Sequence, residues 1–205
     1  MLAASSPMAI NIAFRRKAVA TLTNQIGAYV LCDLDQIPIY VGQSIDGIRA
    51  RVRRHLTSAR SDIIANRQID VWEIAWVWTY PVQNREDINP LEAVLFHQFD
   101  KKSALMNGKL PKAPAQRIRA PKPAQKIQVM SDAEIGEKKA ASLRLPRQAE
   151  HYSQIVGHFL AVKNSKEIAR AIQAHFVRLE RYHRSLLQLA TEEEDKPLAG
   201  EADSF

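Results

Sequence analysis

The stretch Gly27–Leu56 constrains the fold more than any other part of this chain. It contains two short apolar runs, AYVLC and IPIYV, which are separated by an acidic turn and followed by an arginine-rich segment. Apolar runs bounded by glycine and turn residues predict a β-hairpin. If the turn is centred between Leu34 and Asp35, Tyr29 pairs with Tyr40 across the hairpin. Cross-strand partners have Cβ atoms about 5 Å apart, so this register predicts two phenol hydroxyls side by side, as in a phosphate-binding site.

A helix with a basic flank is predicted directly after the hairpin, over residues 45–60, with Asp46 as its N-cap. Four apolar residues recur at helical spacing and form its predicted buried stripe: Ile48, Val52, Leu56 and Ala59. Arg51 and His55 lie one turn apart on the flank of this stripe, where a side chain can be anchored by the core and still reach into a cleft. The remaining arginines lie further round, as phosphate contacts or as a solvated face: Arg49, Arg53, Arg54 and Arg60.

The charge balance favours an anionic partner such as nucleic acid. The 205-residue chain has a net charge of +7 although a cluster of acidic residues lies in its predicted disordered tail, residues 191–205. The single cysteine, Cys32, excludes an intrachain disulfide and is expected to be a small core residue in a reducing compartment. No apolar run approaches the ~20 residues of a membrane span, and no signal peptide is recognisable. We therefore expect a cytoplasmic protein without a membrane partner.

The first helix is expected in the N-terminal arm, residues 1–23, whose first seven residues should be disordered. Its basic triplet Arg15–Lys17 is either a solvated helix face or a phosphate contact beside the site. Residues 61–68 are predicted to form a short helical turn.

A second strand and helix follow. Residues 69–82 predict a strand that is apolar on both faces. Its three tryptophans are expected to be core residues, with base stacking as the alternative. Residues 85–102 predict a helix that carries Glu92 at the edge of its buried face, and Asn107–Gly108 is a turn signal in the loop that follows.

The second half of the chain changes character. Residues 111–130 form a basic, proline-rich linker, which could lie along DNA phosphates or be solvated. Residues 131–190 are predicted to be helical, beginning with a capping box at Ser131–Glu134 and ending in an αα-hairpin of two amphipathic helices, 147–162 and 165–190. Two helices alone seldom bury enough surface, so we expect them to pack on the first domain or on a second copy of the chain.

Residues 24–110 contain six elements in a characteristic order. Two tripeptides, Gly27-Ala28-Tyr29 and Tyr40-Val41-Gly42, are followed by Arg51, His55, Glu92 and Asn107. In these elements the segment resembles the GIY-YIG nuclease family. A lysine that often follows the second tripeptide in that family is Gln43 here, and Arg49 could supply its charge.

The resemblance implies an α/β (α+β) fold with a three-stranded antiparallel sheet flanked by helices. It also implies a divalent-metal-dependent endonuclease acting on DNA, expected to be double-stranded. In that chemistry Tyr29 is the general base, Arg51 binds the phosphate and Glu92 holds one Mg²⁺ or Mn²⁺ ion. Tyr40 would position water or phosphate, and His55 would assist. The expected substrate contacts are Gly42, Gln43, Arg49, Arg54 and Asn107.

Two alternatives stay open. The chain could be a nucleic-acid-binding module of the same fold with little or no cleavage, as Gln43 suggests. It could also be an interaction protein that works through its C-terminal helices. The same helices are the expected interface of a homodimer.

Overall fold

The computed structural model describes residues 11–57, 62–65, 67–114 and 118–194. The predictions for residues 1–10, for Ala59 and Arg60, and for the tail from residue 195 lie outside these ranges. The helices and strands are, in chain order, α1 (Ile12–Ala20), β1 (Gly27–Cys32), β2 (Pro38–Ser44), α2 (Ile48–Thr57), α3 (Asp62–Ala65), η1 (Val71–Glu73), β3 (Trp76–Pro81), η2 (Arg85–Asp87), α4 (Ile88–Asp100), β4 (Gln125–Gln128), α5 (Asp132–Lys139), α6 (Ala141–Ala161) and α7 (Lys166–Glu194).

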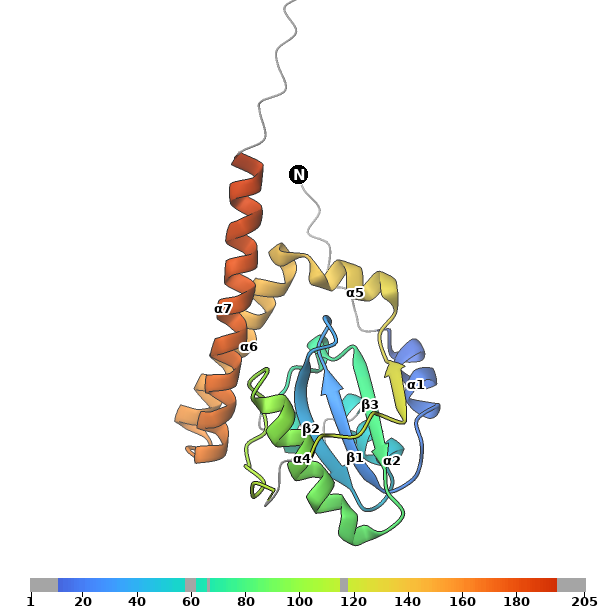
Figure 1. Cartoon of the computed structure of the whole chain (residues 1–205). Coiled ribbons are helices and arrows are strands. Elements are labelled where there is room, and N and C mark those ends of the chain that lie inside the picture. The colour runs from blue at the N-terminus through green and yellow to red at the C-terminus, as the bar shows by residue number, and fades with distance from the viewer. Residues whose placement is uncertain (1–10, 58–61, 66, 115–117, 195–205) are drawn as a thin grey trace, which may run out of the picture.

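The centre of the molecule is a four-stranded antiparallel sheet in the order β2-β1-β3-β4 (Figure 1). The α+β class expected from the sequence is therefore confirmed. The expected number of three strands is wrong, because residues 125–128 of the proline-rich segment pair with β3 as a fourth strand. Pro38 lies on the edge strand β2, as a residue without an N–H requires.

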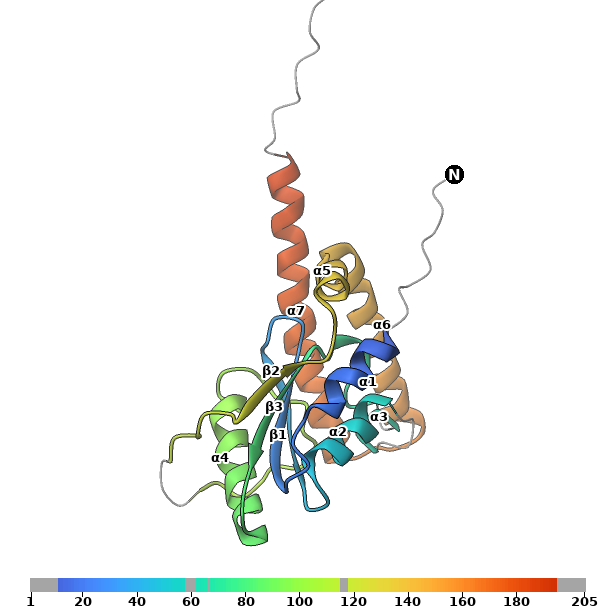
Figure 2. The ribbon, with the colours of Figure 1, turned by 90° about the vertical axis from the view of Figure 1, so that its right-hand side faces the viewer.

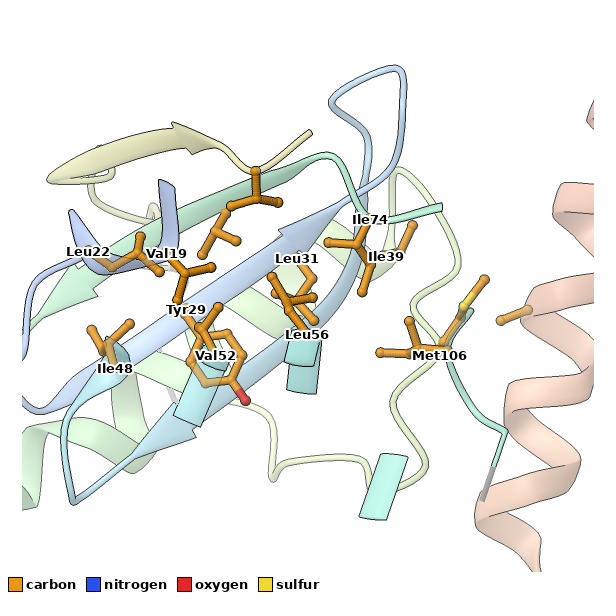
Figure 3. Packing of buried hydrophobic residues seen from close by; sticks show 14 residues of the cluster. Val19, Leu22, Tyr29, Leu31, Ile39, Ile48, Val52, Leu56, Ile74 and Met106 are labelled. Atoms are coloured by element: carbon orange, nitrogen blue, oxygen red, sulfur yellow. The ribbon is translucent and has the colours of Figure 1, made fainter. Parts of the chain in front are cut away.

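Helices cover both faces of the sheet. Seen edge-on, α4 lies against one face, and α1 and α2 lie against the other (Figure 2). All six residues of β1 are buried, and alternate residues face different cores. Tyr29 and Leu31 pack with Ile48, Val52 and Leu56 of α2 (Figure 3), which confirms these three residues of the predicted stripe. On the other face the strand packs against Leu95 and Phe96 of α4, in a cluster that includes Cys32.

The hairpin register differs from the predicted one. Tyr29 pairs with Gly42, and Tyr40 pairs with Leu31. The reason is that the turn holds one residue more than assumed, since Gln36 takes a left-handed conformation (φ 60°), and the ladder is irregular again next to Cys32. The total shift is two residues, which preserves the face on which each side chain lies. The two tyrosines are consequently diagonal neighbours on one face rather than direct partners.

Two local predictions are corrected by hydrogen bonds of backbone N–H groups. The helix α2 begins at Ile48 rather than after Asp46, because the N–H of Ile48 donates to the carbonyl of Gln25 at 3.0 Å. The predicted strand 69–82 starts only at Trp76. Asp70 Oδ1 accepts the N–H of Trp72 at 3.1 Å and begins a 3₁₀ turn instead.

Arg15 is neither solvated nor available to a phosphate. It is buried, with 1% of its surface exposed, and its guanidinium donates to the carbonyls of Val71, Ile74 and Val129 at 3.3, 3.0 and 3.4 Å. The basic triplet therefore contributes a structural arginine that ties α1 to the chain around η1 and to the residue after β4.

The C-terminal helices form the expected αα-hairpin, and core and polar contacts hold it against the first domain (Figure 1). The capping box is confirmed, because Ser131 Oγ accepts the N–H of Glu134. The helix α6 begins earlier than predicted, with Pro146 inside it. The helix α7 continues to Glu194, so the predicted disorder from residue 191 is wrong over its first four residues. A homodimer through these helices stays a prediction.

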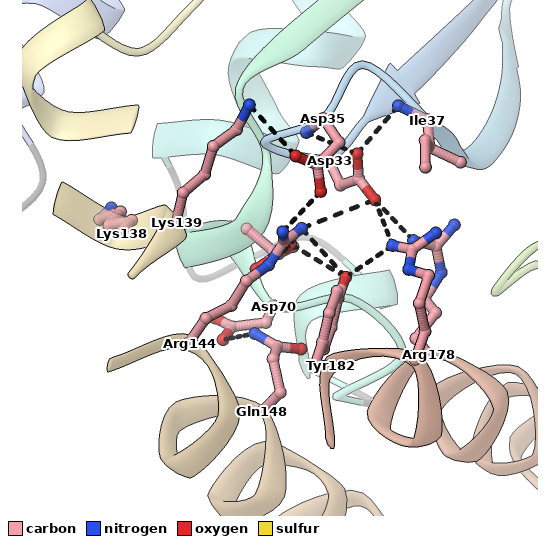
Figure 4. A network of polar contacts seen from close by, with 12 residues as sticks. Asp33, Asp35, Ile37, Asp70, Lys138, Lys139, Arg144, Gln148, Arg178 and Tyr182 are labelled. Carbon is pink, nitrogen blue, oxygen red and sulfur yellow. Dashed lines mark hydrogen bonds and ion pairs between the residues drawn. The ribbon is translucent and has the colours of Figure 1, made fainter. Parts of the chain in front are cut away.

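A buried polar network fastens this hairpin to the β1–β2 turn (Figure 4). Arg178 of α7 donates to Asp33 Oδ2 at 2.8 Å, while Asp33 Oδ1 accepts two backbone N–H groups of the turn. Arg144 of α6 bonds to Glu73, and to Asp35 at 2.5 Å. Charged side chains are rarely buried without partners, and here the acidic and the basic partners come from different halves of the chain.

Within the described ranges, none of the helices combines the length and apolar character that crossing a lipid bilayer requires.

Candidate functional site

A cleft of about 1270 Å³ opens beside the edge of the sheet formed by β2. Six of the predicted site residues line it: Tyr29, Tyr40, Gln43, Arg51, Glu92 and Asn107. They come from β1, β2, α2, α4 and the loop after α4, so the fold brings together side chains that are up to 78 positions apart in the sequence. Arg49 and Arg54 are not among the lining residues. Arg49 Nε instead donates to the carbonyl of Leu22 at 2.6 Å, and Arg54 is exposed.

Tyr29, which lines the cleft, forms a buried hydrogen-bonded pair with His55, which is not among the lining residues. Tyr29 Oη lies 2.6 Å from His55 Nε2. Burial, followed by the charges of Arg51 and Arg54, lowers the pKa of His55 to about 3. The imidazole is therefore neutral at pH 7, and its Nε2 can accept the phenol proton of Tyr29.

The phenol of Tyr29 is itself held in its neutral form. Burial, and then the neighbouring Tyr40, raise its pKa well above the usual value, while the charge of Arg51 acts in the opposite direction. An isolated phenol in this position would rarely ionise. Its hydrogen bond to His55 orients the hydroxyl and gives the phenol proton a defined acceptor.

Gly42 is required by the packing of these rings. A Cβ at this position would lie 2.4 Å from Tyr29 Cζ and Oη, and 2.8 Å from Tyr40 Cε1. The ring centroids of Tyr29 and Tyr40 are 6.4 Å apart, and those of Tyr40 and His55 are 6.2 Å apart. Gly42 is therefore needed because the absence of a side chain leaves room for the aromatic cluster, and its contact with a substrate stays a prediction.

Arg51 is the cationic group of this cleft that is positioned beside the aromatic cluster. Its Nε is buried and has no hydrogen-bond partner among the described residues. Most buried N–H groups are satisfied by protein or ordered water. Because Arg51 also lines the cleft, an oxygen acceptor that enters the cleft can approach its guanidinium. A phosphate oxygen has the charge and geometry to fill this role.

Glu92 supplies a carboxylate from α4. Burial raises its pKa to about 7, and it forms no ion pair within the described part of the chain. The described residues also contain no group of three or more acidic, histidine or cysteine side chains that could hold a metal. A single carboxylate such as Glu92 could serve Mg²⁺ or Mn²⁺ only as one protein ligand, because Mg²⁺ in proteins usually keeps several waters and a phosphate as its other ligands.

Asn107 fixes the loop after α4 to the free edge of β2. Its Nδ2 donates to the carbonyl of Val41 at 2.6 Å, and the N–H of Val41 donates to Asn107 Oδ1 at 3.0 Å. The side-chain amide thus replaces a neighbouring strand at this edge. Arg170 of α7 donates to the Asn107 carbonyl at 2.9 Å, so the C-terminal helices help to hold the same loop.

Sequence reasoning missed one side of the cleft. Its further lining residues include Gln68, Lys109, Lys112, Lys163 and Glu167. The lysines of the loop after Asn107 are visible as a basic run, but nothing local indicates that the turn between α6 and α7 lies beside them. No protein-family model matches this chain, and no curated protein matches it.

Proposed function

We propose that the protein is a divalent-metal-dependent endonuclease of the GIY-YIG type, which hydrolyses phosphodiester bonds of nucleic acid in this cleft. The observation that carries the proposal is the unpaired, buried Nε of Arg51 in the same cleft as the Tyr29–His55 pair and the carboxylate of Glu92. Hydrolysis of a phosphodiester needs a cationic group that binds the phosphate, a group that accepts a proton and a ligand for the metal. Arg51, the Tyr29–His55 pair and Glu92 would supply them in that order.

Arg51 would bind a non-bridging oxygen of the scissile phosphate and offset the negative charge that grows in the transition state. A water molecule attacks phosphorus and gives its proton to Tyr29 Oη while Tyr29 gives its own proton to His55 Nε2. The new P–O bond forms as the bond to the leaving sugar oxygen breaks. This relay avoids a free phenolate, which the raised pKa of Tyr29 disfavours. It forms an imidazolium, which the lowered pKa of His55 disfavours without substrate, so the negative charge of the bound phosphate has to stabilise that cation.

Glu92 would hold the divalent cation, which, when bound, neutralises charge on the phosphate and on the leaving oxygen. Tyr40 is half-buried beside Tyr29, where its hydroxyl can orient the water or the phosphate. Gln43 lines the cleft as a neutral hydrogen-bonding group. Asn107 supports the site because its side-chain amide bonds to the backbone of Val41. Gly42 supports it by leaving room for the ring of Tyr29, and neither residue touches a reacting atom in this scheme.

The test is cleavage of supercoiled plasmid and of labelled DNA and RNA oligonucleotides with Mg²⁺ or Mn²⁺. Wild type should cut, and Arg51→Ala and Glu92→Gln should each lower the rate by at least a hundredfold, because each removes charge stabilisation at the phosphate. Arg53→Ala is the matched control, since Arg53 is an exposed arginine of the same helix. Equal rates for all four proteins would refute this site.

A nucleic-acid-binding module without cleavage is the second candidate, favoured by the neutral Gln43 at the cleft wall. This candidate function predicts that the protein binds nucleic acid but forms no cleavage product with any divalent metal. Binding that weakens steeply with salt is expected for both candidates, so product formation is the measurement that separates them.

A further inference from the structure

The cleft continues beyond the reactive residues, between two walls that the chemistry above does not use. One wall is the loop 108–114, and the other is the turn between α6 and α7. Three exposed lysines lie along this extension, Lys109 and Lys112 on the loop and Lys163 on the turn. The carboxylate in this part is Glu167 of α7, so positive charge is in excess.

The two walls are held close to each other. A Cβ on Gly108 would lie 2.7 Å from the Cβ of Glu167 and 3.0 Å from Gln68 Nε2, so the loop passes directly against the start of α7. Arg170 anchors the same loop through the Asn107 carbonyl, and it also bonds to Asp100 at 2.5 Å. Figure 1 shows the loop lying between α4 and the C-terminal helices.

The charges of this extension lie near one another. Hydrogen bonds from its own backbone N–H and from Ser165 are the main causes that lower the pKa of Glu167, and the charges of Lys163 and Lys109 contribute. The lysines of the two walls therefore act on the same region of the cleft. A chain of phosphates passing through it would meet both.

The size and the apolar lining indicate what kind of anion fits. The cleft, at about 1270 Å³, is larger than the ~300–1,000 Å³ of a pocket for a small ligand, which favours a segment of polymer over a mononucleotide. The loop also presents Leu110, 61% exposed, together with Pro111 and Pro114 along the lining. Bases in a duplex keep their faces stacked on one another, whereas unpaired bases offer them to a protein.

We propose that this extension binds a single-stranded stretch of nucleic acid next to the scissile phosphate. Its phosphates lie on Lys109, Lys112 and Lys163, and its unpaired bases lie on Leu110 and Pro111. The inference rests on the proposed function for the position of the cut, and it names the substrate class: a duplex with an overhang or branch beside the cleavage point.

Binding is measured first, without metal, so that no cutting is needed. The full-length protein is titrated against a fluorescent blunt duplex and against the same duplex with a single-stranded overhang on either end, by anisotropy over a range of salt. The test variant is Lys109→Ala/Lys112→Ala/Lys163→Ala. The control is Lys101→Ala/Lys102→Ala/Lys122→Ala, which removes the same charge from exposed lysines outside the cleft lining.

Wild type and control should bind an overhang at least tenfold more tightly than the blunt duplex, and the test variant should lose that preference. Its salt slope on the overhang should fall by about 2, because three contacts contribute ~0.7 each on single strands. Equal binding of blunt and overhang duplexes by wild type, or an unchanged preference in the test variant, would overturn the inference.

The same proteins are then assayed for cleavage with Mg²⁺. Cutting without any overhang preference in binding would refute the single-strand subsite and leave the proposed hydrolysis standing. An overhang preference that depends on the three lysines, with no cutting of any substrate, would refute the hydrolysis and leave the subsite standing.

Discussion

The side chain of Arg178 joins α7 to the β1–β2 turn, and its removal should destabilise the whole fold. Its guanidinium donates to Asp33 Oδ2, to the carbonyl of Pro38 and to Ser103 Oγ, each at 2.8 Å. Breaking a buried ion pair by removing one partner costs about 3–5 kcal/mol, because the other charge stays buried. Arg181 remains 3.2 Å from the fully buried Asp33. We therefore expect Arg178→Ala to cost about 3 kcal/mol, at the lower end of that range.

The assay is urea unfolding at neutral pH, followed by the fluorescence of the three tryptophans. For a chain of this size a loss of about 3 kcal/mol corresponds to a fall of roughly 6–12 °C in Tm. Arg184→Ala is the matched control, since Arg184 lies on the same helix in an exposed i,i+4 pair with Glu180. That pair should contribute less than about 0.5 kcal/mol. If Arg178→Ala unfolds at the same urea concentration as the control, the network does not hold the helices to the sheet.

Three further predictions concern the site and the buried histidines. Gly42→Ala should abolish cleavage and lower Tm, because its Cβ would overlap the ring of Tyr29; an active, stable variant would contradict this packing. Tyr29→Phe should abolish cleavage and lower the free energy of unfolding by about 1–3 kcal/mol, since it leaves His55 Nε2 without the phenol donor. Unfolding and rate measurements on one preparation would show an intact fold without activity. Burial lowers the pKa of His175 to about 3, so its contribution to stability is present above pH 6.5 and is lost on acidification, by roughly 2 kcal/mol between pH 7 and 5. His175→Gln keeps a donor for the Gln68 carbonyl and should flatten the stability curve between pH 7 and 5. If wild type and the variant lose the same stability over this range, His175 does not cause the pH dependence.

The hairpin shows which part of a site a sequence can specify. Alternation along β1 and β2 predicts which residues share a face, and Tyr29 and Tyr40 do lie together. Their register depends on the turn, and nothing in the sequence states that Gln36 takes a positive φ. The prediction of a direct Tyr29–Tyr40 pair was wrong by two residues. The error left the site intact only because an even shift preserves the face.

Buried charges account for most of what the sequence did not reveal. A basic residue on a helix is usually solvated, so Arg15 and Arg178 gave no local sign of burial. Their partners are backbone carbonyls and a carboxylate more than 50 residues away in the chain. The strand β4 was missed for a related reason: the run QKIQ has little β character, and it becomes a strand because β3 offers it a free edge.

The helix α7 connects these observations to the candidate site. It contacts the β1–β2 turn through Arg178 and the loop after α4 through Arg170, so it is fixed at two points on the same edge of the sheet. The groups proposed for the chemistry all lie between residues 29 and 92, whereas the lysines of the cleft extension lie between residues 109 and 163. If the proposals hold, changes to these three lysines should therefore alter which nucleic acids enter the cleft and how tightly they bind, and leave the reacting groups unchanged. A helix pair that moved independently of the cleft would have to break the buried Asp33 ion pair together with the contacts of Arg144 and Arg170, so we expect the helices and the cleft to move as one body.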